Sequence, residues 1–171
     1  MTGSRGGVVV CGADGSVGAR HALARAVRSA ASRGARLRVV AAFDPPDRSF
    51  GWTVGGGVGI PIPSTTEVAA AIRADVADTL DDVLDELAAE IPVSPELDIV
   101  VEVGPPSSVL LAESMDAVEL VVGHRGHGVV SALGSVALAC LLHASCPVTV
   151  VPEPASRAAT ITVEAPAAAR A

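Results

Sequence analysis

The stretch from Leu120 to Ser135 carries the residues whose types and spacing are best suited to holding a ligand. A short apolar segment, Leu120 to Val122, runs into a loop with glycines at 123, 126 and 128, and Gly134-Ser135 then opens a second apolar segment. Glycines let the backbone approach a ligand closely, and the unpaired N–H groups of a helix start favour negative charge. The pattern predicts a phosphate cradle, with a plain strand-to-helix turn as the alternative.

A second glycine-marked turn, Gly12 to Ser16, directly follows the apolar run from Gly7 to Cys11. Its Asp14 could accept hydrogen bonds from ribose hydroxyls or hold Mg²⁺ through water. Asp also stabilises turns and helix starts, so a purely structural role is the alternative.

Strands and helices must together position these two turns. Apolar runs predict five strands, and the segments between them predict four helical connections, the first capped by Ser16 and stopped by Gly34. Such alternation is typical of a doubly wound parallel sheet with helices on both faces, which binds ligands where the winding direction reverses. If the first and fourth strands are neighbours there, the two glycine turns face each other. The expected strands are 7–11, 37–43, 97–103, 120–122 and 148–151.

The connections differ in character. Glu67 to Glu90 predicts an amphipathic helix whose acids face water, and Ser107 is expected to cap a short helix that ends at Met115. The segment from about 44 to 66, with the single Trp52, is expected to be a lid over the site or a disordered loop. Residues 1–152 are expected to form one domain, and residues 153–171 a flexible Ala/Pro-rich tail.

Composition excludes several classes of function. A formal net charge of -7 argues against nucleic-acid binding, and the absence of lysine excludes a Walker A motif or a Schiff base. No apolar run reaches eighteen residues and no signal peptide is evident, which predicts a cytoplasmic protein without a membrane span. Cys11, Cys140 and Cys146 are expected to be reduced, mostly buried thiols, and His124 with His127 lacks further metal ligands at a compelling spacing.

Three motifs together resemble the universal stress protein family. They are the early strand ending in Cys-Gly-Ala-Asp-Gly-Ser, the Gly-x-x-Gly loop followed by Gly-Ser, and the closing Cys146-Pro-Val-x-Val-Val151. The match spans roughly residues 6 to 152. The resemblance implies the doubly wound sheet, a homodimer through the last strand, Val148 to Val151, and in one branch ATP binding at the glycine loop. We therefore expect a five-stranded parallel sheet of order 3-2-1-4-5.

The same resemblance implies a set of nucleotide contacts. The loop between Gly126 and Gly134 holds seven residues, two fewer than the ATP-binding pattern. The residues carried over are Gly12, Ala13, Asp14, Ala42, Val122, Gly123, Arg125, Gly126, Gly134, Ser135 and Val136.

Two functions follow from these observations. The first is a homodimeric stress-response regulator that binds ATP, with or without Mg²⁺, and hydrolyses it slowly at most, since no nucleophile with a base and an orienting group is evident. The alternative is a dimeric interaction module whose shortened loop no longer binds nucleotide.

Overall fold

The structure, a computed structural model, describes residues 6–45, 63–124 and 133–153. It contains five parallel strands in the order β3-β2-β1-β4-β5, which confirms the expected fold and strand order. The strands are β1 (Val8–Gly12), β2 (Arg36–Phe43), β3 (Leu97–Val103), β4 (Glu119–Gly123) and β5 (Val148–Val151).

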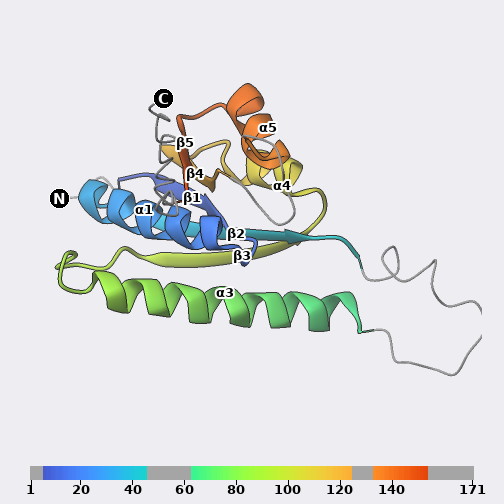
Figure 1. Cartoon of the computed structure of the whole chain (residues 1–171), viewed down its shortest axis with the longest axis horizontal. Coiled ribbons are helices and arrows are strands. Elements are labelled where there is room, and N and C mark those ends of the chain that lie inside the picture. Colours follow the sequence, from blue (N-terminus) through green and yellow to red (C-terminus); the bar gives the residue numbers. More distant parts are fainter. Residues whose placement is uncertain (1–5, 46–62, 125–132, 154–171) are drawn as a thin grey trace, which may run out of the picture.

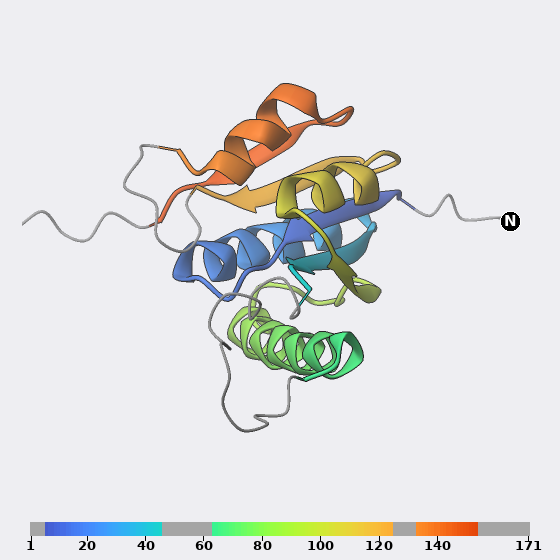
Figure 2. The same ribbon diagram turned by 90° about the vertical axis from the view of Figure 1, so that its right-hand side faces the viewer.

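Among the described residues, four helices cover the two faces of this sheet. Helices α1 and α3 pack on one face, and α4 and α5 pack on the other (Figures 1 and 2). Alternate strand residues enter the two cores: Val9 and Cys11 of β1 join the first, whereas Val10 joins the second. The helices are α1 (Val17–Arg33), α3 (Thr65–Leu87), α4 (Pro106–Glu113) and α5 (Ser135–His143).

The ends of α1 follow the expected capping chemistry. The Ser16 hydroxyl accepts the backbone N–H of Ala19 at 3.1 Å, and Gly34 ends the helix in the left-handed conformation with φ 60°. The small residues Ala22, Ala26 and Ala30 are fully buried, which allows α1 to lie close to the sheet.

Helix α3 begins two residues earlier than expected, because Ser64 and Glu67 form a capping box. Its apolar stripe is buried only from Val76 onward, and its acids are mostly exposed. Two of them, Asp82 and Glu86, pair with Arg20 of α1 at 3.6 and 2.5 Å, so they join the helices as well as facing water.

The prediction that Ser107 caps α4 is wrong. Ser107 lies inside the helix, and Pro105 occupies the N-cap position without a side-chain hydrogen bond. The reason is that Pro106, with no N–H to satisfy, suits the first helical position, so the helix starts two residues earlier than a cap at Ser107 would place it.

Several expectations lie largely or wholly outside the described residues. They are the character of segment 44–66 with Trp52, the tail 153–171, and the interior of the glycine loop with Arg125 and Gly126. Within the described part of the chain, no helix is long and apolar enough to cross a membrane.

Candidate functional site

Strands β1 and β4 are hydrogen-bonded neighbours at the centre of the sheet, with Val10 opposite Leu120. From β1 the chain winds to β2 and β3 in one direction, and β4 and β5 lie on the other side. The reversal between β1 and β4 is the switch point, so the turns after Gly12 and Gly123 diverge around one crevice.

A cavity of about 230 Å³ lies at this switch point. It is lined by nine of the eleven residues predicted to contact a nucleotide, and the other two, Arg125 and Gly126, lie outside the described residues. We call it the switch-point cavity. One group of lining residues comes from the ends of β1 and β2 and the turn after β1: Gly12, Ala13, Asp14 and Ala42. The other group comes from β4 and the start of α5: Val122, Gly123, Gly134, Ser135 and Val136.

Hydrogen bonds to β2 and within the turn itself hold the β1–α1 turn in place. The N–H of Ala13 reaches the carbonyl of Val40 at 2.9 Å, which ties the turn to β2. One oxygen of the Asp14 carboxylate accepts the N–H of Ser16 at 3.0 Å, and Ser16 in turn caps α1. Gly15 supports this turn with φ 77°, a conformation that L side chains rarely adopt. Asp14 therefore orders its turn while also lining the cavity.

The start of α5 offers backbone donors to the opposite side of the cavity. Gly134 is the N-cap and provides no side-chain acceptor, so the first N–H groups of α5 receive no cap from it. Its own N–H donates to the carbonyl of His124 at 2.9 Å, which closes the two ends of the glycine loop on each other. Helix starts of this kind attract phosphate and other anions.

The floor of the cavity is apolar and comes partly from residues that the sequence did not point to. Pro106 and Leu110 of α4 line it together with Ala137 of α5. A Cβ added at Gly12 would stand 3.1 Å from a methyl group of Leu110, so a side chain there would crowd the floor. The contact of α4 with the cavity joins residues that are far apart in the sequence, so no local sequence pattern predicts it.

Gly123 sets the distance between α1 and β4. A Cβ at this position would lie 2.9 Å from the carbonyl carbon of Gly18 and 3.0 Å from its oxygen. Two facing glycines thus let the first turn of α1 rest on the end of β4, which keeps Ser16 and Gly134 at one crevice.

The three thiols are free, as expected for reduced cysteines. Burial raises the pKa of Cys11 to about 12, so this thiol stays protonated at neutral pH. Within residues 6–45, 63–124 and 133–153, no group of three or more His, Cys, Asp or Glu side chains is placed to hold a metal ion.

Comparisons with known proteins agree with this architecture. The model of the Universal stress protein family matches residues 7–152. A universal stress protein in complex with cAMP superposes with a TM-score of 0.60, at 22% identity over 88% of this chain and 100% of that chain. A search of curated proteins found no match.

Two further structures are similar. A protein of the universal stress protein family from Burkholderia pseudomallei is 27% identical over 88% of this chain and 99% of its own, with a TM-score of 0.57. A family member from Arabidopsis thaliana with AMP bound is 16% identical over 91% of this chain and 97% of its own, with a TM-score of 0.53.

Proposed function

The chain belongs to the universal stress protein family, and on this premise we propose that its switch-point cavity binds an adenine nucleotide, ATP with or without Mg²⁺, in a regulatory role. The observation that carries the proposal is the convergence of nine predicted contact residues on this cavity. Two similar structures, at 22% and 16% identity, hold cAMP and AMP, which supports the same class of ligand here.

Each part of the cavity would take one part of the nucleotide. The donors at the start of α5, around Ser135 and Val136, would bind phosphates, with Arg125 available as a further cation. Asp14 would accept hydrogen bonds from the ribose, and Ala42 at the end of β2 would give the base a small apolar wall. The protein would hold the nucleotide and hydrolyse it slowly at most.

A homodimer through β5 is the second part of the proposal. β5 is an edge strand of the described sheet, and its four residues are half-buried. On the neighbouring α5, Leu138, Leu141 and Leu142 are 47%, 47% and 68% exposed. An apolar edge of this kind invites pairing, and a second copy of the chain would cover it.

The two parts of the proposal meet at one hydrogen bond. The N–H of His124, at the entrance of the glycine loop, donates to the carbonyl of Val151, the last residue of β5, at 2.8 Å. A nucleotide bound at the glycine loop would therefore act close to the proposed dimer edge, in a cytoplasmic protein whose dimer responds to nucleotide.

Thermal unfolding in a titration of ATP, AMP and cAMP, each with and without Mg²⁺, tests the binding. A ligand at a hundred times its dissociation constant stabilises a fold by about 2.7 kcal/mol, so melting should shift upward. No shift at millimolar concentrations of any of the three, and no nucleotide released when the purified protein is denatured, would favour the non-binding interaction module instead.

A further inference from the structure

A second cavity, of about 380 Å³, lies between α1, the end of β2 and α3. We call it the α1–α3 cavity. It shares a wall with the switch-point cavity, because Ala13, Asp14, Ser16, Ala19 and Ala42 line both. It lies on the face of the sheet that carries α1 and α3, whereas the floor of the switch-point cavity comes from α4 and α5.

The inner surface of the α1–α3 cavity is apolar. Leu23 of α1, Ala41 of β2 and Val76 of α3 line it, with exposed fractions of 2%, 3% and 8%. Small-molecule sites combine such an apolar lining with a few polar groups that fix orientation, and their volumes begin at roughly 300 Å³. This cavity has the size and lining of such a site.

The charged groups on its wall disfavour an anion. Asp14 and Asp75 contribute carboxylates, and the one cation that lines it among the described residues is Arg20. The guanidinium of Arg20 is engaged by Glu86 at 2.5 Å and Asp82 at 3.6 Å, so an anionic ligand would compete with two carboxylates for it.

The start of α1 does not reverse this preference. The N–H of Ser16 donates to the carboxylate of Asp14, and the N–H of Ala19 donates to the Ser16 hydroxyl. Two of the donors that would attract an anion to this helix start are thus already used within the protein. The backbone N–H groups at the start of α5, on the other side of the shared wall, are better donors for phosphate groups.

From this geometry we propose that the α1–α3 cavity is a second ligand site, for a small organic cation with an apolar body. The apolar part rests on Leu23 and Val76, and the ammonium group faces Asp75. The site goes beyond nucleotide binding and does not require it. A ligand here touches the same β1–α1 turn as a nucleotide would, through Ala13 and Asp14.

Amide chemical-shift changes in the ¹⁵N-labelled full chain, measured without nucleotide, test the site. The probes are protonated 2-phenylethylamine, neutral 2-phenylethanol and anionic 3-phenylpropanoate. The expected result is saturable changes centred on Ala41, Val76 and Thr79, with the amine binding more tightly than the alcohol and the alcohol more tightly than the carboxylate.

The variant Asp75→Asn removes one lining carboxylate from an exposed helix position, so the fold should persist. Its affinity for the amine should fall about fivefold, and its affinity for the alcohol should not change. Asp78→Asn, an exposed acid of α3 that does not line the cavity, removes the same charge and should leave amine binding nearly intact. Equal losses in both variants, a preference for the carboxylate, changes centred on Ser135, or no saturable change at all would each overturn the proposal.

Discussion

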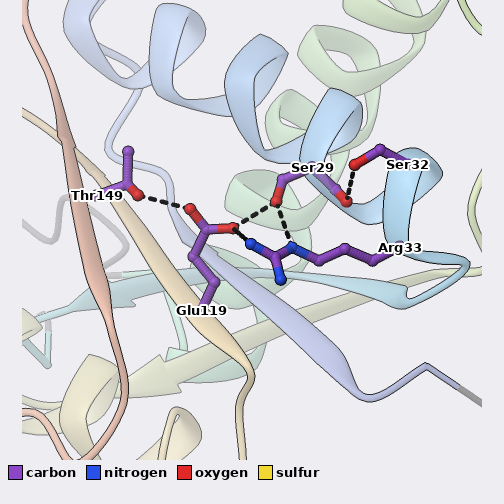
Figure 3. Close-up of polar contacts among 5 residues, drawn as sticks. All are labelled: Ser29, Ser32, Arg33, Glu119 and Thr149. Atoms are coloured by element: carbon purple, nitrogen blue, oxygen red, sulfur yellow. Dashed lines mark hydrogen bonds and ion pairs between the residues drawn. The ribbon is translucent and has the colours of Figure 1, made fainter.

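The carboxylate of Glu119, at the start of β4, accepts a hydrogen bond of 2.5 Å from the hydroxyl of Thr149 on β5. Its other oxygen accepts the hydroxyl of Ser29 and lies 3.6 Å from the guanidinium of Arg33, both on α1 (Figure 3). Only 5% of the Glu119 side chain is exposed. One buried acid therefore fastens the edge strand of the proposed dimer to the helix that begins at the candidate site.

Replacing Glu119 by Gln should destabilise the fold by about 1–3 kcal/mol. The amide has the same shape but no charge, so the charge-assisted hydrogen bonds from Ser29 and Thr149 weaken and the attraction to Arg33 is lost. Urea unfolding at pH 7 measures the loss. Glu96→Gln changes an exposed acid outside this network; it is the matched control and should stay within about 0.5 kcal/mol of the wild type.

The stability that Glu119 contributes should depend on pH. Burial tends to raise the pKa of Glu119, but hydrogen bonds from Ser29 and Thr149 and the charges of Arg25 and Arg33 leave it below its ordinary value of 4.5. A carboxyl group with a lowered pKa stabilises the fold fully above the unfolded value, and this contribution is lost as pH falls through the folded value.

Urea unfolding of the wild type and Glu119→Gln between pH 7 and pH 3 checks the sign. The gap in unfolding free energy should be constant above about pH 5 and should narrow at lower pH. A gap that widens on acidification would mean that the folded protein binds the proton of Glu119 more tightly than the unfolded chain does.

Gly123→Ala should destabilise the fold by about 1–3 kcal/mol, because the new methyl group meets the backbone of Gly18 and cannot be relieved by a rotamer change. At Gly15 an added Cβ meets nothing within 4 Å, so Gly15→Ala adds mainly the strain of φ 77°, about 1 kcal/mol. Chemical denaturation compares the two. Wild-type stability in Gly123→Ala would refute the tight contact between α1 and β4.

Val150→Pro should turn the proposed dimer into a monomer without unfolding the chain. The carbonyls of Pro147 and Val151 accept bonds from β4, so by alternation the N–H of Val150 points to the open edge. Proline there removes a donor needed only by a partner strand. Light scattering at micromolar concentration gives the mass.

Thr149→Pro is the control for that experiment, since its N–H faces β4 and its loss should destabilise the folded chain itself. A wild-type protein that is monomeric at this concentration, or a Val150→Pro variant that remains a dimer, would exclude β5 as the interface.

Much of the fold was predictable because it depends on local patterns. Apolar runs predicted the bounds of β3 and β5, and Ser16 and Gly34 predicted both ends of α1. Glu119 was missed for a physical reason: a charged residue beside an apolar run reads as the solvent-exposed end of a strand. Its burial depends on Ser29 and Thr149, which are 90 and 30 positions away.

The candidate site was predictable only in part, for a similar reason. The glycine turns after β1 and β4 are local features, and the sheet topology brings them together. The contribution of Pro106 and Leu110 to the floor, and the α1–α3 cavity with Asp75, depend on how helices pack across the sheet. The periodicity of α3 shows which side is apolar, but it does not show where α1 lies beside it.

The affinity for ATP of three proteins, measured by titration calorimetry, tests the central claim most directly. The proteins are the wild type, Ser135→Glu and Thr66→Glu. Ser135 and Thr66 are both exposed and both lie in the first turn of a helix, where a carboxylate favours folding. Only Ser135 lines the switch-point cavity. We expect the wild type and Thr66→Glu to bind ATP. The affinity of Ser135→Glu for ATP should be lower by about tenfold or more, because the new carboxylate would face and repel the phosphates. Equal affinity in all three proteins, or no binding by the wild type, would contradict it.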